Sequence, residues 1–99
     1  MEIKKTQTEG VCELTLTGRL DTTTAPQLQQ ALTAAMRTDS MVELDFAGIE
    51  YVSSAGLRVL LQGQKNALAF GKGMTLKNVS PEVMEVFEIT GFSGILTII

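Results

Sequence analysis

The sequence predicts an α/β protein in which a mixed β-sheet, built from a β-hairpin followed by βα repeats, is covered by helices. Three observations lead to this prediction. Apolar and polar residues alternate over Val11–Leu20 and Met41–Phe46, the pattern of half-buried strands. Between and after these segments, apolar residues recur at helical spacing. The expected order is β-β-α-β-α-β-α-β, in which the later strands run mostly parallel to one another.

The first two strands are expected to form a hairpin. Ile3–Thr6 is a short first strand, and Glu9-Gly10 has the composition of a turn before the second strand at Val11–Leu20. Two strands this close in sequence can pair only in the antiparallel sense. The single cysteine, Cys12, is in phase with the apolar side of the second strand, which predicts a small buried side chain.

The first helix is predicted to start at Thr24. Thr24 and Gln27 have the spacing of a capping box, and Pro26 lies in the first turn, where its missing amide costs nothing. Apolar residues then follow at positions i, i+3, i+4, i+7 and i+8, which form one face of a helix. These residues are Leu28, Ala31, Leu32, Ala35 and Met36.

The centre of the chain, Val42–Leu61, contains a strand, a short link, two serines and the start of a helix. We expect the strand at Met41–Phe46 and the helix from about Ser54 to Phe70. Ser53 and Ser54 are both suited to start it, because a serine hydroxyl can accept a hydrogen bond from the free amides of the first turn. The residues alone leave open which serine is the cap.

The last third of the chain is expected to add a strand, a helix and a strand. Met74–Val79 has the strand pattern, and Ser80-Pro81-Glu82 combines a capping serine, a first-turn proline and an acid near the positive end of the helix dipole. The apolar segment Ile95–Ile99 predicts a last buried strand.

Length, apolar runs and charge indicate how many domains to expect and whether the protein enters a membrane or binds nucleic acid. A chain of 99 residues predicts one domain over residues 1–99. No apolar run approaches the roughly 20 residues that cross a bilayer, and the N-terminus lacks a signal-peptide pattern, so a cytoplasmic protein without membrane insertion is expected. The net charge is −3 and the eight basic residues are scattered, which argues against direct nucleic-acid binding.

The composition also argues against catalysis. The chain has no histidine and only one cysteine, so a histidine-based general base and a structural zinc site of cysteines and histidines are excluded. The glycines around Lys72 do not have the spacing of a phosphate-binding loop. We therefore expect no enzyme activity, no metal and no cofactor, and without a base neither serine is an activated nucleophile.

The segment LDFAGIEYVSSAGLRVLL, with GRLDTTTAPQL upstream, resembles a STAS domain, and more narrowly the stand-alone bacterial anti-sigma factor antagonists. A strand ending at Leu44–Phe46 is followed, after seven intervening residues, by Ser54–Leu57 opening a helix. The Gly-x-Leu-Asp sequence at Gly18–Asp21, after the second strand, adds to the resemblance. The expected order of elements also agrees, so the resemblance covers the whole chain.

The resemblance implies regulation by partner switching. An unphosphorylated antagonist binds an anti-sigma factor that is also a serine protein kinase, which releases a sigma factor for transcription. The kinase then phosphorylates the antagonist, the complex separates, and a protein phosphatase restores it. By this resemblance the phosphorylated residue is Ser54, two residues before Gly56. Ser53, which stands where the family often has an acid, is a second candidate, and the free chain is expected to be a monomer.

The resemblance also places the partner-binding surface on the serine-bearing turn and on the loop after the second strand. The expected residues are Asp21, Thr22, Thr23, Tyr51, Val52, Ser53, Ser54, Ala55, Gly56 and Arg58.

The residues by themselves leave a purely structural role open at several of these positions. Either serine could serve only as a helix cap, and Gly56 could serve only to allow close packing. Tyr51 and Val52 could pack beneath the turn, and Asp21 could be only a loop aspartate ahead of Thr24.

A second function is also compatible with the resemblance. STAS domains serve as small cytoplasmic subunits of bacterial phospholipid-transport ATPase complexes. Such a subunit would need no phosphorylation, and it would be recovered together with an ATPase rather than with a kinase.

Overall fold

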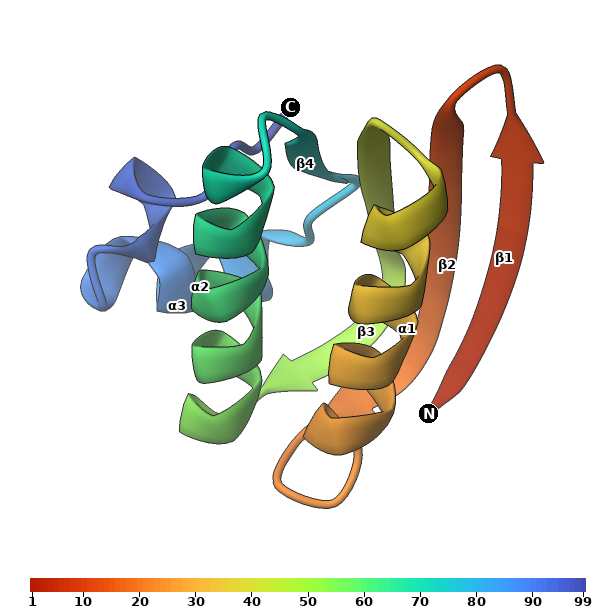
Figure 1. The fold of residues 1–99 in the computed structure, drawn as a ribbon. Helices are drawn as coiled ribbons and strands as arrows, with labels where there is room; N and C mark the ends of the chain where they lie inside the picture. Colours follow the sequence, from red (N-terminus) through yellow and green to blue (C-terminus); the bar gives the residue numbers. More distant parts are fainter.

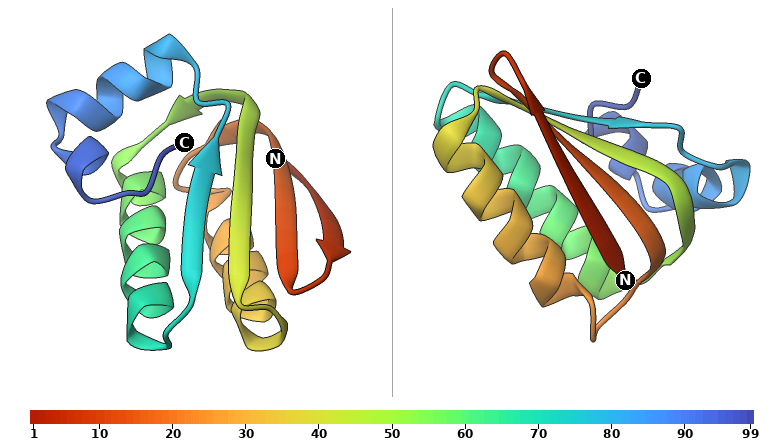
Figure 2. Two further views of the ribbon diagram at one scale, coloured as in Figure 1. Left: turned by 90° about the horizontal axis from the view of Figure 1, so that it is seen from above. Right: turned by 90° about the vertical axis from the view of Figure 1, so that its right-hand side faces the viewer.

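The computed structural model describes residues 1–99 as a mixed four-stranded sheet with helices on one side and at one end (Figures 1 and 2). The fold class predicted from the sequence is confirmed. The elements are β1 (Glu2–Thr8), β2 (Val11–Leu20), α1 (Ala25–Thr38), β3 (Met41–Val52), α2 (Ser54–Ala69), β4 (Gly73–Lys77), α3 (Pro81–Ile89) and a 3₁₀ turn, η1 (Phe92–Gly94).

The strands lie in the order β1-β2-β3-β4. β1 and β2 are antiparallel, whereas β2 with β3 and β3 with β4 are parallel. Glu9 and Gly10 form the hairpin turn with φ angles of 47° and 82°. Positive φ at both central residues is the geometry that matches the twist of a two-residue hairpin. The expected hairpin and turn are therefore confirmed.

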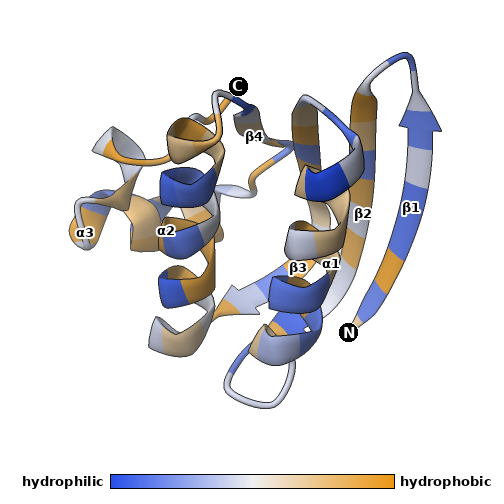
Figure 3. Cartoon of the chain, in the orientation of Figure 1, coloured by the Kyte–Doolittle hydropathy of each residue, from blue (hydrophilic) through white to orange (hydrophobic).

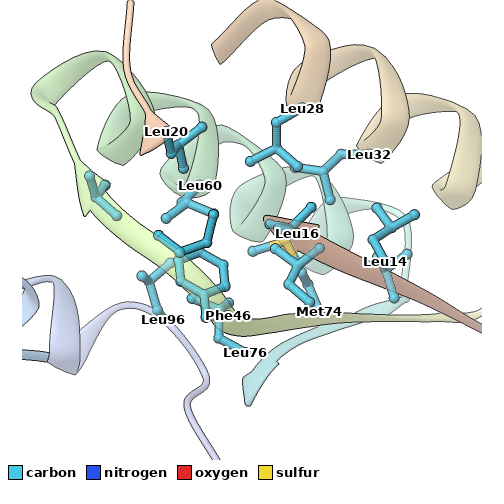
Figure 4. Close-up of a cluster of buried hydrophobic side chains, with 14 of the residues drawn as sticks. Leu14, Leu16, Leu20, Leu28, Leu32, Phe46, Leu60, Met74, Leu76 and Leu96 are labelled. Carbon is cyan, nitrogen blue, oxygen red and sulfur yellow. The ribbon is translucent and has the colours of Figure 1, made fainter. Parts of the chain in front are cut away.

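The main core lies between the sheet and the layer formed by α1 and α2. Figure 4 shows Leu28 and Leu32 of α1 directed toward Leu14 and Leu16 of β2. The side chain of Cys12 is buried within the same cluster, as the alternation predicted. β1 is largely hydrophilic (Figure 3), and a polar edge strand discourages pairing with other chains.

The third helix packs at the far end of the sheet, away from α1 and α2 (Figure 2). Its Phe87 ring lies 6.2 Å from the ring of Phe46 in β3, in a tilted arrangement. Ser80 caps the helix by accepting a hydrogen bond from the amide of Val83, at 3.3 Å, and Pro81 is its first residue. The start of this helix was predicted correctly.

Two predicted boundaries are wrong around the sheet. β3 does not end at Phe46 but continues to Val52, so the expected link is strand. The strand extends because β2 remains beside it, with irregularities in the register after Thr15 and after Gly18. β4 ends at Lys77 rather than Val79, because Asn78 has a positive φ of 57° that turns the chain toward α3.

The expected last strand at Ile95–Ile99 is also wrong. Ile95 has helical backbone angles, and the segment makes only an isolated bridge between Ile98 and Leu76 of β4. Leu96 is buried, but Ile95 and Ile99 are exposed. The segment is held to β4 by two backbone hydrogen bonds with Leu76, and Leu96 and Ile98 pack on the core, so it lies along the sheet edge without forming a strand.

The expected capping box at Thr24 is wrong as well. Thr24 has helical backbone angles and its side chain makes no capping hydrogen bond. Its hydroxyl instead donates a hydrogen bond to the carbonyl of Arg19 at 2.8 Å. The side-chain amide of Gln27 donates to the carbonyl of Met1 at 3.2 Å. Loop contacts thus replace the local cap.

Candidate functional site

The serine-bearing turn and the loop after β2 meet at one edge of the sheet. Because β2 and β3 are parallel, their carboxyl ends lie side by side, with Leu20 opposite Val52. The amide of Ser53 donates to the carbonyl of Leu20 at 2.9 Å. Asp21 and Ser54 each follow this hydrogen bond by one residue, so the loop after β2 and the start of α2 lie side by side.

The two serines differ in role. Ser53 is the N-cap of α2, with extended backbone angles, and its hydroxyl accepts a hydrogen bond from the amide of Gly56 at 3.3 Å. It is half-buried, whereas Ser54 is the first residue of the helix and is exposed. The structure therefore resolves which serine is the cap, and it leaves the hydroxyl of Ser54 at the surface.

Two expected contact residues lie beneath the surface. Val52 is 5% exposed, and its side chain belongs to the core. Gly56 is buried against β2, where an added Cβ would lie 2.6 Å from Cγ of Leu20. We therefore correct the expected surface at these two positions: Val52 and Gly56 support the turn from below, and the simpler alternative of close packing holds for Gly56.

The Asp21 loop is held together by its own carboxylate. Oδ1 of Asp21 accepts hydrogen bonds from the hydroxyl of Thr23 at 2.7 Å, from the amide of Thr23 at 3.1 Å and from the amide of Thr24 at 3.2 Å. The hydroxyl of Thr23, followed by these backbone amides, lowers the pKa of Asp21 below its ordinary value. Asp21 therefore remains charged near neutral pH and fixes the loop beside the serines.

Arg19 is a site residue that sequence reasoning missed. Its guanidinium lies 4.3 Å from the centre of the Tyr51 ring, a cation–π contact, and 3.8 Å from Oδ2 of Asp21. It pairs in register with Tyr51, which is 43% exposed. The available signal was its place within the Gly-x-Leu-Asp sequence, two residues before a carboxylate.

The other expected contact residues surround this turn. Thr22, Thr23 and Arg58 are exposed, and Ala55 is half-buried. Thr22, Ala55 and Arg58 line one end of a groove between α1 and α2. Apart from Val52 and Gly56, the expected residues are exposed or half-buried, and they lie at the start of α2, at the end of β3 and in the loop after β2.

No group of three or more potential metal-binding side chains is present, and no histidine is available as a base. Ser54 is exposed at the first position of α2. No helix in the structure combines the length and apolar character needed to cross a bilayer.

Comparison with known families agrees with this picture. The family model described as "Mlab, STAS domain" matches residues 3–97. BtrV of Bordetella bronchiseptica, which carries the name of an anti-sigma factor antagonist, is 33% identical over 99 residues, covering 99% of this chain and 85% of BtrV. The anti-sigma-B factor antagonist of Listeria monocytogenes is 29% identical over 99 residues, covering 99% of this chain and 86% of the relative.

Solved structures of similar proteins share the fold. The anti-sigma factor antagonist SpoIIAA in its unphosphorylated form has a TM-score of 0.82 at 19% identity, covering 99% of this chain and 88% of SpoIIAA. The phosphorylated form of the Bacillus SpoIIAA protein has a TM-score of 0.76, also at 19% identity, covering 99% of this chain and 91% of SpoIIAA. The curated relatives are named as regulators rather than enzymes, as the composition led us to expect.

Proposed function

This chain belongs to the STAS domain family and to its anti-sigma factor antagonists, and we propose that it acts as a partner switch controlled by phosphorylation of Ser54. In its unphosphorylated state it binds an anti-sigma factor that is also a serine protein kinase, which releases a sigma factor for transcription. Phosphorylation ends the complex, and a protein phosphatase reverses the modification. The observation that carries the proposal is the exposed hydroxyl of Ser54 beside the Asp21 loop.

The structure favours Ser54 over Ser53 as the phosphorylated residue. A kinase must surround the acceptor hydroxyl, and only Ser54 is exposed. The Ser53 oxygen is engaged by the amide of Gly56, so its modification would disturb the start of α2. Phosphorylation at Ser54 leaves that cap intact.

The charge of the phosphoryl group explains how phosphorylation of Ser54 ends the complex. A phosphoryl group adds roughly −1.5 to −2 charges at pH 7. At the first turn of a helix the added charge meets free amides and the positive end of the dipole, so the fold tolerates it. Within a protein interface the same charge must lose its water, which opposes binding. The modification can therefore end a complex without rearranging the domain.

The test is an affinity purification from the native cell that uses the unphosphorylated chain as bait. The purification is carried out once without ATP and once with ATP. We expect an anti-sigma factor kinase to be retained without ATP and released with it, and mass spectrometry to find phosphate on Ser54. The matched variants are Ser54→Ala, which should bind and resist release, and Ser53→Ala, which should be released like the wild type. Phosphate on another residue, or a Ser54→Asp chain that binds as tightly as the wild type, would contradict the proposal.

The family model that matches residues 3–97 is described as "Mlab, STAS domain" rather than as an antagonist, which favours a second candidate function. In that case the chain is the small STAS subunit of a phospholipid-transport ATPase complex. The same purification distinguishes the two: a membrane ATPase retained equally with and without ATP would favour transport.

A further inference from the structure

Charge is distributed unevenly over the surface of this acidic chain. α1 and α2 carry three of the eight basic residues, Arg37, Arg58 and Lys65, and none of the eleven acidic residues. By contrast, α3 alone carries three glutamates and no basic residue. A protein with a net charge of −3 therefore presents one layer of helices that is purely cationic and amide-rich.

These two helices also form a continuous groove. They run side by side over one face of the sheet (Figure 1). Three adjoining depressions follow their seam: the first two share Gln29 and Gln62, and the second and third share Met36 and Asn66. The groove begins at the Ser54 turn, where Arg58 lines it, and Arg37 lines its far end.

We propose that this α1–α2 groove, from Arg58 to Arg37, docks an acidic helical segment of the anti-sigma factor that binds at the Ser54 turn. The inference rests on the proposed function and extends its interface by the length of α1 and α2. A seam between two helices is a shape that a third helix fills by packing its side chains between theirs. Complementary charge at both ends would orient that helix and speed its association.

Local charge supports an acidic occupant. Asp21 precedes Thr22, which lines the start of the groove, and its carboxylate is already engaged by Thr23, Thr24 and Arg19. The groove walls otherwise carry uncharged side chains, such as the amide of Gln29, the hydroxyl of Thr33 and the apolar side chain of Val59. A second copy of this chain is disfavoured as the occupant, because a symmetric contact would bring the same arginines together.

The groove also connects docking to phosphorylation. Ser54 and Arg58 are four residues apart on α2, a spacing at which helical side chains are neighbours. Both residues are exposed. A phosphoryl group on Ser54 would therefore compete for the guanidinium that an acidic partner residue would otherwise use.

The experiment measures affinity for the anti-sigma factor recovered by the purification described above. Two variants act on the groove away from the Ser54 turn: Arg37→Glu reverses a charge at the far end, and Gln29→Glu adds an acid to the wall. The matched control is Lys4→Glu, the same charge reversal on exposed β1. Circular dichroism and thermal melts confirm that each variant is folded. The acid that Gln29→Glu introduces lies in the N-terminal half of α1, where the helix dipole tolerates a negative charge.

We expect each groove variant to weaken binding about tenfold or more, while Lys4→Glu changes it less than about twofold. If the anti-sigma factor binds all variants equally, docking in the groove is contradicted and the proposed function is unaffected. Weakening by Lys4→Glu as large as that by Arg37→Glu, which changes the net charge by the same amount, would reduce the effect to net charge and overturn docking in the groove. Self-association of the chain that Arg37→Glu abolishes would replace the acidic partner with a second copy. Failure of the wild type to retain any anti-sigma factor would overturn both proposals.

Discussion

Gly56, at the start of α2, lies directly against Leu20, the last residue of β2. A Cβ on Gly56 would stand 2.6 Å from Cγ of Leu20 and 3.0 Å from its carbonyl oxygen. The same carbonyl accepts the amide of Ser53 at 2.9 Å. The serine-bearing turn is thus fixed to the neighbouring strand by one hydrogen bond and one close backbone contact.

This contact predicts that Gly56→Ala destabilises the fold. Alanine gains up to about 1 kcal/mol in helix propensity over glycine, but overpacking costs about 1–3 kcal/mol, and the Leu20 carbonyl cannot move aside. We expect a net loss of about 1 kcal/mol in the free energy of unfolding, measured by denaturant titration. The matched control is Gly63→Ala in the same helix, where the nearest atoms are flexible side-chain ends of Met74 and Leu32. Equal effects of the two variants would contradict this account.

The roles of the two serines predict opposite effects on stability and modification. Ser53→Ala removes the cap of α2 and should lower the free energy of unfolding by about 1 kcal/mol. Ser54→Ala, at an exposed first-turn position, should change it by less than about 0.5 kcal/mol. Kinase assays should show the reverse order, with phosphorylation lost only in Ser54→Ala. A large loss of stability in Ser54→Ala would show that Ser54 also supports the turn.

The hydrogen bonds of Asp21 predict an acid-sensitive loop. Its folded-state pKa is lowered, first by the hydroxyl of Thr23 and then by backbone amides. The stability it contributes is therefore present above the unfolded pKa, near 4, and is lost as pH falls through the lower folded pKa. Asp21→Asn should be less stable than the wild type at pH 7, with the difference shrinking toward pH 2 in denaturant titrations. A difference that persists unchanged at pH 2 would contradict this prediction.

The spacing of Ser54 and Arg58 predicts that phosphoserine at Ser54 titrates abnormally. A nearby guanidinium favours the dianion, so the second pKa of the phosphate, ordinarily about 6, should lie lower in the wild type than in Arg58→Gln. We expect the two pKa values to differ by only roughly 0.5, because exposed charges are screened by solvent. The measurement is a ³¹P NMR titration of chains in which phosphoserine is installed during synthesis. The control is Lys65→Gln, on the same helix but eleven residues from Ser54; an equal shift in both variants would indicate a general charge effect.

Local patterns predicted most of the fold because their causes are local. Alternation over Val11–Leu20 identified β2 with its observed bounds, and Ser80-Pro81 identified the start of α3. The capping box at Thr24 failed because its hydroxyl found a partner in the Arg19 carbonyl, which no spacing rule includes. The extension of β3 to Val52 was missed because pairing with β2, rather than residue alternation, sustains that part of the strand.

The sequence by itself determined the hairpin, the alternation of strands and helices, the lack of a histidine base and the serine pair at a helix start. Through resemblance, it also predicted that Asp21 and Ser54 belong to one partner-binding surface. Only the tertiary structure decided that Ser53 caps α2 while Ser54 is exposed, that Val52 and Gly56 lie beneath the surface, and that Arg19 joins Tyr51 and Asp21. The physical reason is that the parallel register of β2 and β3 brings residues about thirty positions apart to one edge of the sheet.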